Sequence, residues 1–452
     1  MAPGQPEAVQ GPALPEERTV HFVLDLALRI GEVQMSSGAG AADVTATIIA
    51  VAGAYGLPHC EVDVIFTSIT VACSRGTDEP PITSVRVVRS RSLDYTRLAA
   101  VEGLVRRITY GRVGVTAAQT ELERITSAAH PYPRWVATAA WAGMAAAITV
   151  LIGGAPMMAV AAAGITAVID RVGRLLNKRA LPFFYQQVVG GALATGGALA
   201  LLASGLLPAR PTVLVAAALT VLLSGLSVVS TVQDAITGYN VTAAGRTMEV
   251  SLMTAGLIAG VVLALHISVS LGMDYTPLAD PLPPSALRLP VQTCAGAAAA
   301  GLFALGSYAT PRALLVASVA GGVGAAAYGA LVLAGQGAIA ASAGAAVVIG
   351  FAGGVISRRL RMPPLVVAVS GMVPLLPGLT TYRALYELAV QRSANGVPTL
   401  MLAAAIALAL AAGVVLGEYL AQPVRSGLGR LERRLSGPRM SGPLQPTERR
   451  LE

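Results

Sequence analysis

The chain has 452 residues, of which 54% are hydrophobic and 12% charged, with a mean hydropathy of +0.66. Soluble globular proteins carry about 25% charged residues, so this composition excludes a water-soluble particle of this size. The net charge of +8 does not indicate nucleic-acid binding, because aromatic residues make up 4% of the chain and no basic stripe is interleaved with them. The three cysteines and four histidines are scattered, which predicts neither a disulfide framework nor a metal site.

The N-terminal third is predicted to be a cytoplasmic domain. Residues 1–19 form a Pro- and Gly-containing lead-in, predicted to be disordered, without the apolar core of a secretory signal. Residues 20–130 carry charge at a near-normal density and are expected to form a small α+β domain. Periodicity predicts helices at 20–34, 43–55, 93–110 and 117–128, and strands within 61–73 and 83–89. The run Ser36-Ser37-Gly38 is expected to break the first helix, and Asp43 to cap the second.

From residue 131 onward the sequence is typical of a membrane protein. A helix of about 20 apolar residues crosses a bilayer, and ten stretches qualify, near residues 135–153, 156–172, 183–207, 211–233, 247–271, 291–308, 312–335, 338–357, 364–380 and 398–420. We therefore predict a mostly α, polytopic membrane protein with about ten transmembrane helices. Its expected parts are a first five-helix repeat at 131–272, an outer loop at 273–290, a second five-helix repeat at 291–422 and a cytoplasmic basic tail at 423–452.

The positive charges predict the orientation. If the α+β domain is inside, thirteen Lys and Arg residues fall on inner segments, against four on outer ones, namely Arg210, Arg288, Arg383 and Arg392. The positive-inside rule therefore predicts a multi-pass protein of the bacterial inner (cell) membrane, with the N-terminal domain and the C-terminus in the cytoplasm.

Two apolar stretches resemble each other and predict an inverted repeat. The fourth begins at Pro211 and contains Ser224-Gly225, and the ninth begins at Pro364 and contains Ser370-Gly371. Equivalent positions are thus five helices apart, and an odd number of helices places the second half upside down relative to the first. This plan recurs in secondary transporters.

The ends of these two stretches carry the candidate site. Pro374, Pro377 and Gly378 are expected to break the ninth helix inside the membrane, where freed backbone groups are tolerated only against protein or a wet cavity and can bind a zwitterion. The matching stretch of the fourth helix lacks these prolines. Asp234 is interpreted either as a counter-ion or proton carrier, or as a residue of the inner interface. The candidate substrate-binding or coupling residues are Thr231, Asp234, Thr237, Gly238, Asn240, Arg246, Glu249, His266, Pro374, Pro377, Gly378, Thr381 and Tyr382.

Some of these candidates have a plainer interpretation. Arg246 and Glu249 are expected to be interfacial anchors near a helix end. His266 is placed midway along the fifth helix and is expected to be neutral, because a charge there costs about 3 kcal/mol or more on insertion scales; a proton relay is the alternative.

Several short motifs, taken in order, resemble the threonine/serine exporter family. They lie at residues 31–38, 43–44, 56–57, 61–64, 67–69, 234–238, 246–249 and 373–378, and the resemblance spans about residues 20–420. It implies a soluble N-terminal domain, about ten helices in two related halves, and export of small hydroxylated amino acids such as threonine and serine, driven by the proton motive force. The implied partners are a small-molecule substrate, protons and the lipid bilayer, without a cofactor. Relatives split into two subunits are associated with dicarboxylate export, which stays an alternative.

Two further function classes remain as alternatives. His59, Cys60, Glu61 and Asp63 place a base, a nucleophile and two carboxylates together, which suggests a hydrolase-like domain. Adjacent strand residues point to opposite faces, however, so Cys60 and Glu61 are not expected to share one site, and no catalytic residue is predicted. Glu61 and Asp63 are instead expected to form a solvated strand face or an interaction site for the membrane part. A channel is the other alternative, and a homo-oligomer is left open.

Overall fold

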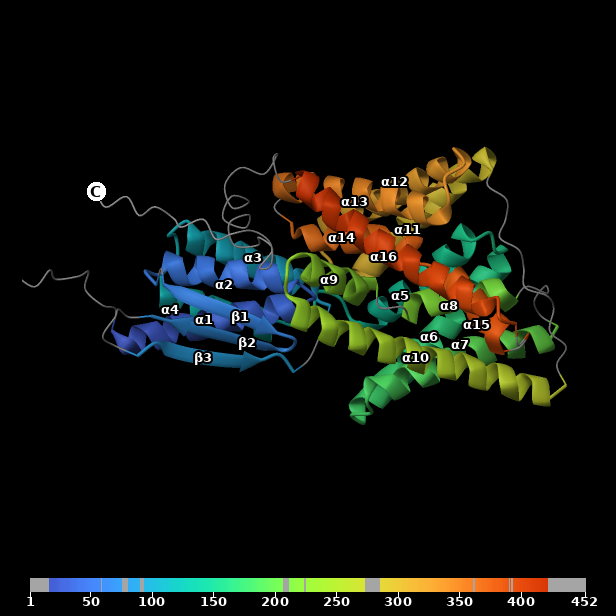
Figure 1. Cartoon of the computed structure of the whole chain (residues 1–452), viewed down its shortest axis with the longest axis horizontal. Coiled ribbons are helices and arrows are strands. Elements are labelled where there is room, and N and C mark those ends of the chain that lie inside the picture. Colours follow the sequence, from blue (N-terminus) through green and yellow to red (C-terminus); the bar gives the residue numbers. More distant parts are fainter. Residues whose placement is uncertain are drawn as a thin grey trace, which may run out of the picture.

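The computed structural model describes residues 16–57, 59–74, 80–89, 93–205, 211–222, 225–272, 285–360, 362–389, 391 and 393–421. An α+β part, residues 16–128, and a helical part, residues 134–421, follow each other along the long axis of the molecule (Figure 1). The expected disordered lead-in, as far as residue 15, and the expected basic tail lie outside the described residues, as does most of the expected outer loop.

The α+β part has the element order that the sequence predicts. Its elements are α1 (Glu17–Ser36), α2 (Ala41–Ala54), β1 (Cys60–Ile65), β2 (Ser68–Cys73), β3 (Ile82–Val87), α3 (Tyr95–Thr109) and α4 (Val115–Ser127). The described strands form an antiparallel sheet in the order β1-β2-β3, and Phe66 and Thr67 make a two-residue turn between β1 and β2. Phe66 adopts a positive φ of 54°, which the favoured two-residue hairpin turns require.

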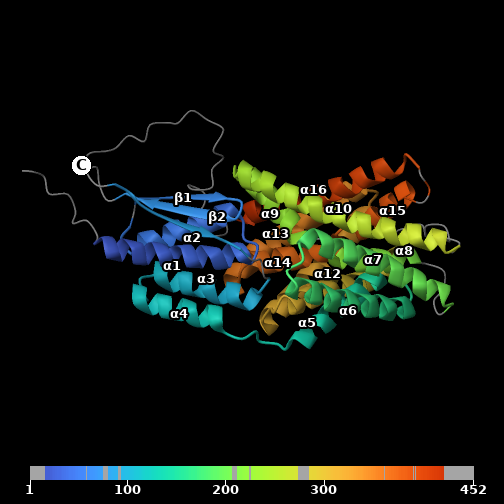
Figure 2. The same ribbon diagram turned by 90° about the horizontal axis from the view of Figure 1, so that it is seen from below.

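Alternation along the strands decides which face of the sheet is buried. Val62 and Val64 point into a core shared with α1 and α2, whereas Glu61 and Ile65 are exposed on the other face. β1 forms one edge of the sheet, and α2 lies beside it (Figures 1 and 2).

The helical part contains most of the chain. Its helices are α5 (Arg134–Leu151), α6 (Pro156–Lys178), α7 (Phe183–Ala203), α8 (Pro211–Leu222), α9 (Gly225–Ile236), α10 (Asn240–Ser270), the 3₁₀ turn η1 (Ala286–Arg288), α11 (Leu289–Gly306), α12 (Pro311–Leu333), α13 (Ala338–Leu360), α14 (Pro364–Met372), the 3₁₀ turn η2 (Val373–Leu375), α15 (Gly378–Ala389) and α16 (Gly396–Ala421).

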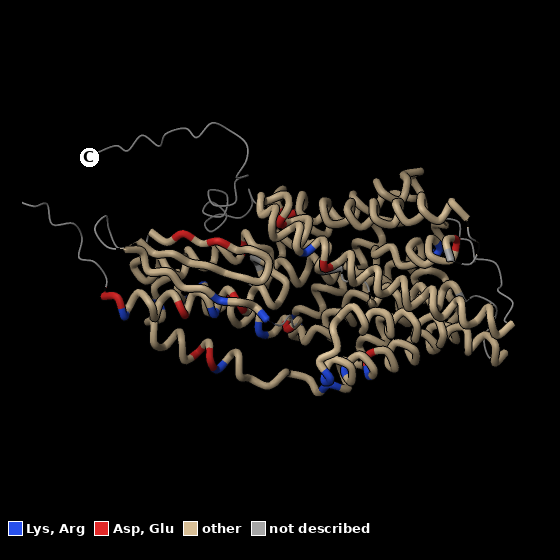
Figure 3. Tube along the Cα trace, turned by 60° about the horizontal axis from the view of Figure 1, so that its bottom comes forward, with Lys and Arg blue, Asp and Glu red and all other residues tan. Residues whose placement is uncertain are grey.

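Among the described residues, seven helices are long and apolar enough to cross a membrane, and nine spans result if each of two bent pairs counts as one. Charged residues concentrate on the α+β part and at helix ends (Figure 3). The chain is therefore a polytopic membrane protein.

The fourth and ninth apolar stretches are both bent helix pairs. Pro364–Leu375 and Gly378–Leu388 meet at 45°, as the prolines predict. Thr212–Leu222 and Ser227–Ile236 meet at 54°, although the sequence suggested a single helix there. The fourth stretch lacks the prolines of the ninth, so the sequence offers no comparable reason for a bend there.

The helices pack in recurrent pairs. α5 packs on α6, α11 on α12, α7 on α10 and α13 on α16, while α8 contacts α15 and α9 contacts α14. Glycines allow the closest crossings: a Cβ on Gly260 would collide with the carbonyl oxygen of Val188, and one on Gly417 with that of Val347. Small residues at interfaces are typical of membrane helices, because they let backbones approach each other.

The start of α3 attaches the α+β part to the turn between α11 and α12. The Tyr95 N–H donates to the Ser307 carbonyl oxygen (3.0 Å), and the Thr96 hydroxyl donates to the Tyr308 carbonyl oxygen. The His130 ring stacks on Tyr308 with the centroids 4.2 Å apart. This contact ties the N-terminal elements to the second group of helices, α11–α16.

Candidate functional site

The turn between α9 and α10 positions the first group of candidate residues. Gly238, at a φ of +88°, ends α9 in the left-handed conformation that favours glycine. The Tyr239 N–H then donates back to the Asp234 carbonyl oxygen (2.8 Å), and the Thr237 hydroxyl donates to the Gln233 carbonyl oxygen (2.8 Å). The turn brings α10 back alongside α9, so that residues 234 and 246 face each other.

Asp234 and Arg246 form a buried ion pair across this turn. The Arg246 Nη1 lies 2.9 Å from Asp234 Oδ2, and the side chains are 4% and 0% exposed. A charge in such a place is tolerated only when it is paired and hydrogen-bonded. The structure therefore joins two residues that the sequence analysis assigned to different roles, since Arg246 was expected to be an interfacial anchor.

The turn between α1 and α2 completes the coordination of this pair. The Ala41 N–H donates to Asp234 Oδ1 (2.7 Å), Arg246 Nη2 donates to the Ala39 carbonyl oxygen (3.4 Å), and the Ser230 hydroxyl donates to the Gly38 carbonyl oxygen (2.8 Å). We call residues 38–41 together with Ser230, Asp234 and Arg246 the junction. In the junction, the α+β part is held against the helical part by a buried charge.

The junction corrects the expected cap of α2. The sequence suggested Asp43 as the N-cap, but the helix begins at Ala41 with Gly40 at the cap position. Asp234 takes over the role that a capping side chain plays, because its carboxylate accepts the Ala41 N–H at the positive end of the helix. A Cβ on Gly40 would lie 3.0 Å from the Gln233 side chain and 3.3 Å from Asp234 Oδ1, so the approach leaves little room for a larger residue.

The second group of candidates surrounds the break between α14 and α15. Pro374 and Gly378 are buried, and the Thr381 hydroxyl donates to the Pro377 carbonyl oxygen (2.7 Å). Tyr382 is 2% exposed, and its ring centroid lies 6.3 Å from that of Tyr386.

An apolar cluster connects the break with α9. Met372, Leu375 and Leu376 pack in one cluster with Val228, Val229 and Val232 of α9. Val232 is two residues before Asp234 in the same helix. The helix break and the junction therefore contact the same short helix, through residues 228–234.

The remaining candidates lie apart from the ion pair or on its margin. Asn240 and His266 are exposed on α10, and His266 is close to the end of that helix rather than midway along it. Glu249 is half-buried one turn after Arg246. Thr231 is half-buried, and its hydroxyl donates to the Ser227 carbonyl oxygen (2.6 Å).

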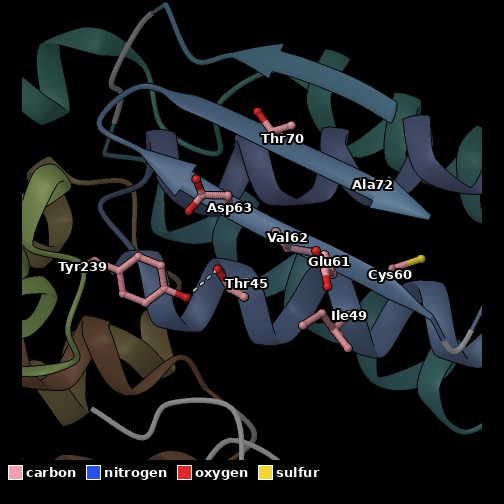
Figure 4. Close-up of a pocket in the computed structure, with 9 residues that line it drawn as sticks. All are labelled: Thr45, Ile49, Cys60, Glu61, Val62, Asp63, Thr70, Ala72 and Tyr239. Carbon is pink, nitrogen blue, oxygen red and sulfur yellow. Dashed lines mark hydrogen bonds between the residues drawn. The ribbon is translucent and has the colours of Figure 1, made fainter. Parts of the chain in front are cut away.

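Glu61 and Asp63 border a pocket of ≈ 500 Å³ between β1 and α2. Figure 4 shows Tyr239 and Thr45 at one end of the pocket and Cys60 at the other; the full lining is Thr45, Ile49, Cys60, Glu61, Val62, Asp63, Thr70, Ala72 and Tyr239. The expectation that Cys60 and Glu61 cannot border one site was wrong, because β1 is an edge strand and the pocket includes residues of both its faces. Burial, together with the neighbouring Cys73, raises the pKa of the Cys60 thiol to about 12, so the thiol is protonated at neutral pH and is a poor nucleophile.

Sequence reasoning missed the residues that connect the two parts. The run Ser36-Ser37-Gly38 was expected only to break a helix, and nothing in the sequence predicts that the backbone of the nearby Ala39 and Ala41 binds Arg246 and Asp234. Tyr239 was also missed, although its hydroxyl is hydrogen-bonded to Thr45 Oγ1 (2.9 Å). Long-range backbone contacts of this kind leave no local pattern.

Comparison with known proteins identifies the family. A family model described as "Putative threonine/serine exporter" matches residues 25–268, and one described as "Threonine/Serine exporter, ThrE" matches residues 292–420. The chain is 43% identical over 419 residues to a Mycobacterium tuberculosis protein named "Probable threonine/serine exporter", covering 90% of this chain and 78% of the relative. It is 34% identical over 416 residues to a Corynebacterium glutamicum protein named "Threonine/serine exporter", covering 91% and 85%. No solved structure matches. The resemblance expected from the sequence motifs is thus confirmed, and the chain belongs to the threonine/serine exporter family.

Proposed function

We propose that this protein is a secondary active transporter that exports threonine and serine from the cytoplasm, driven by the proton motive force. The substrates are those in the names of its relatives, which cover most of the chain. The observation that carries the coupling is the buried Asp234–Arg246 pair, because an ionisable pair inside a transporter is a default candidate for a proton site.

The packing of the helices supports an inverted repeat of five plus five spans. With α5–α10 matched in order to α11–α16, the contacts of α5 with α6 and of α7 with α10 correspond to those of α11 with α12 and of α13 with α16. The two bent spans also cross reciprocally, since α8 contacts α15 and α9 contacts α14. In this correspondence α8 matches α14 and α9 matches α15, so the α8–α15 contact maps onto the α14–α9 contact. An internal two-fold relation between the halves requires both contacts.

The same correspondence supports α6 as the tenth span. α6 falls outside the spans found by length and composition, and its last turns carry Asp170, Arg171, Arg174 and Lys178. It nevertheless packs on α5, α7 and α8, as its counterpart α12 packs on α11, α13 and α14. Its charged end then lies at the cytoplasmic surface, where the positive-inside rule places it.

A coupling mechanism follows from the junction. Protonation of the Asp234 carboxylate would remove the charge that holds Arg246 and weaken the hydrogen bond from the Ala41 N–H. The α1–α2 turn would then be released from α9, and α9 could move against the break between α14 and α15. Freed backbone groups at that break offer carbonyl oxygens and amides to the ammonium and carboxylate of a zwitterionic substrate.

The test is transport in proteoliposomes loaded with labelled threonine, under an imposed proton gradient and membrane potential, with and without an uncoupler. We expect saturable release that serine competes with and that the uncoupler abolishes. Asp234→Asn should reduce the rate about tenfold or more, a barrier increase of at least about 1.4 kcal/mol, and Pro377→Ala should reduce it as well. Glu123→Gln, in an exposed ion pair with Arg29, is the matched control. Parallel vesicles are loaded with labelled succinate, and release of succinate but not of threonine would refute the proposed substrate. Threonine release that persists with the uncoupler would refute coupling to the proton motive force.

A further inference from the structure

The pocket between β1 and α2 has no role in the transport mechanism above. Its ≈ 500 Å³ falls within the range of about 300–1,000 Å³ that small-molecule sites occupy. Its wall combines the carboxylates of Glu61 and Asp63 with the hydroxyls of Thr45, Thr70 and Tyr239. Such a set of groups suits a small ligand with an ammonium group.

The register of the β1–β2 hairpin shows which backbone groups face the pocket edge. The Ile65–Ser68 pair closes the two-residue turn, and at the other end the Ser74 N–H donates to the His59 carbonyl oxygen (2.9 Å). Hydrogen-bonded and non-hydrogen-bonded pairs alternate in an antiparallel ladder, so Cys60, Val62 and Val64 direct their N–H and C=O groups away from β2. The Thr242 hydroxyl, on α10, confirms this by donating to the Val64 carbonyl oxygen (2.7 Å).

The length of this edge limits the occupant. Thr242 also accepts the Phe66 N–H (3.0 Å), so the start of α10 covers the edge from Val64 onward. Cys60 and Val62 are left as the pocket-lining residues of β1 whose backbone N–H and C=O groups point away from β2. Strands are usually about 3–10 residues long, most often about 5–6, so this segment is short for pairing with a peptide strand.

A single free amino acid fits the remaining edge. One residue in an antiparallel pair exchanges two hydrogen bonds with its partner, donating an N–H and accepting at its C=O. The carboxylate and ammonium groups of an α-amino acid can make the same two bonds to Val62. Glu61 and Asp63 beside them attract the ammonium end.

We propose that the pocket is a cytoplasmic binding site for one free α-amino acid, separate from the transport path. Its ligand would be sensed at the junction through Tyr239. That residue lines the pocket, is hydrogen-bonded through its hydroxyl to Thr45, and through its N–H to the Asp234 carbonyl oxygen. A regulatory role for the exported amino acid itself rests on the proposed function, whereas the binding site does not.

Hydrogen exchange of the full chain in lipid nanodiscs tests the site. L-Threonine at about ten times its dissociation constant should slow exchange of the Val62 amide about tenfold. The effect is measured in peptides that cover residues 57–66. Threonine methyl ester, which has no carboxylate, and 3-hydroxybutyrate, which has no ammonium, should not. Glu61→Gln with Asp63→Asn should abolish this protection, and Glu17→Gln, an exposed carboxylate outside the pocket, should keep it. In Tyr239→Phe, protection should stay at β1 but no longer extend to residues 230–246.

The outcomes separate this site from the export function. Unchanged exchange at residues 57–66 in a preparation that transports threonine would overturn the site, and so would protection that survives in the Glu61→Gln, Asp63→Asn variant. Protection at β1 in a preparation that does not transport threonine would support the site and refute export. Circular dichroism and the protection of α1 in each variant show whether it is folded.

Discussion

Asp234 receives a hydrogen bond from the backbone of α2 and an ion pair from α10 while its own side chain is fully buried. The pair does not need to stabilise the fold relative to apolar residues, because desolvation offsets much of its attraction. Removing one partner is different, since the other charge is then left buried. A single substitution of Asp234 or Arg246 is therefore expected to lower the stability of the protein strongly.

A double-mutant cycle tests this asymmetry. Asp234→Asn and Arg246→Met should each destabilise the protein by about 3–5 kcal/mol, whereas the double variant should recover much of the loss, because no unpaired charge remains. Thermal unfolding of each variant in detergent is the measurement. Glu123→Gln, which breaks the exposed pair with Arg29, should cost less than about 1 kcal/mol. Additive effects of the two junction variants would contradict a direct coupling between them.

At the scale of elements, sequence periodicity predicted most of the helices and all of the described strands, because their apolar positions follow the 3.6- and 2-residue repeats. The break at Pro374 and Pro377 was predicted from another local signal, because proline cannot continue a helix. The bend between α8 and α9 was not, since Ser and Gly occur throughout membrane helices without bending them. The Asp234–Arg246 pair could not be inferred either, because the turn geometry at Gly238 decides which face of α10 meets α9.

Close helix crossings provide an element-scale prediction. Gly260→Ala and Gly417→Ala place a methyl group against backbone carbonyl oxygens of α7 and α13, which cannot move without separating the helices. Each should destabilise the protein by about 1–3 kcal/mol. Gly164→Ala on α6 meets nothing within 4 Å and is the matched control. Thermal unfolding measures all three. Equal stability of Gly260→Ala and Gly164→Ala would show that the α7–α10 crossing tolerates more space than this packing allows.

At the scale of the whole molecule, the α+β part contacts the turns α9–α10 and α11–α12, which must then lie on the same side of the membrane. In the orientation proposed above from the positive-inside rule, that side is the cytoplasm. With the ten spans proposed above, the α6–α7 connection would lie inside and the α12–α13 connection outside.

Labelling of single cysteines checks the orientation. In a chain without Cys60, Cys73 and Cys294, Gln336→Cys in the α12–α13 loop should react with a membrane-impermeant maleimide added to intact cells. Asn177→Cys at the end of α6 should react only after the cells are opened. Both positions are exposed, so burial does not account for a difference. The reverse pattern would require the α+β part to be outside.

The two attachment points of the α+β part also bear on kinetics. One holds it to α9 and α10 through the junction, and the other holds it to Ser307 and Tyr308 beyond α11. If the two groups of helices tilt against each other in each transport cycle, a part with one continuous core cannot follow both, and one attachment has to separate every time. The work of that separation is then a component of the activation barrier. The strength with which the α+β part docks would accordingly affect the turnover rate more than it affects the affinity for substrate.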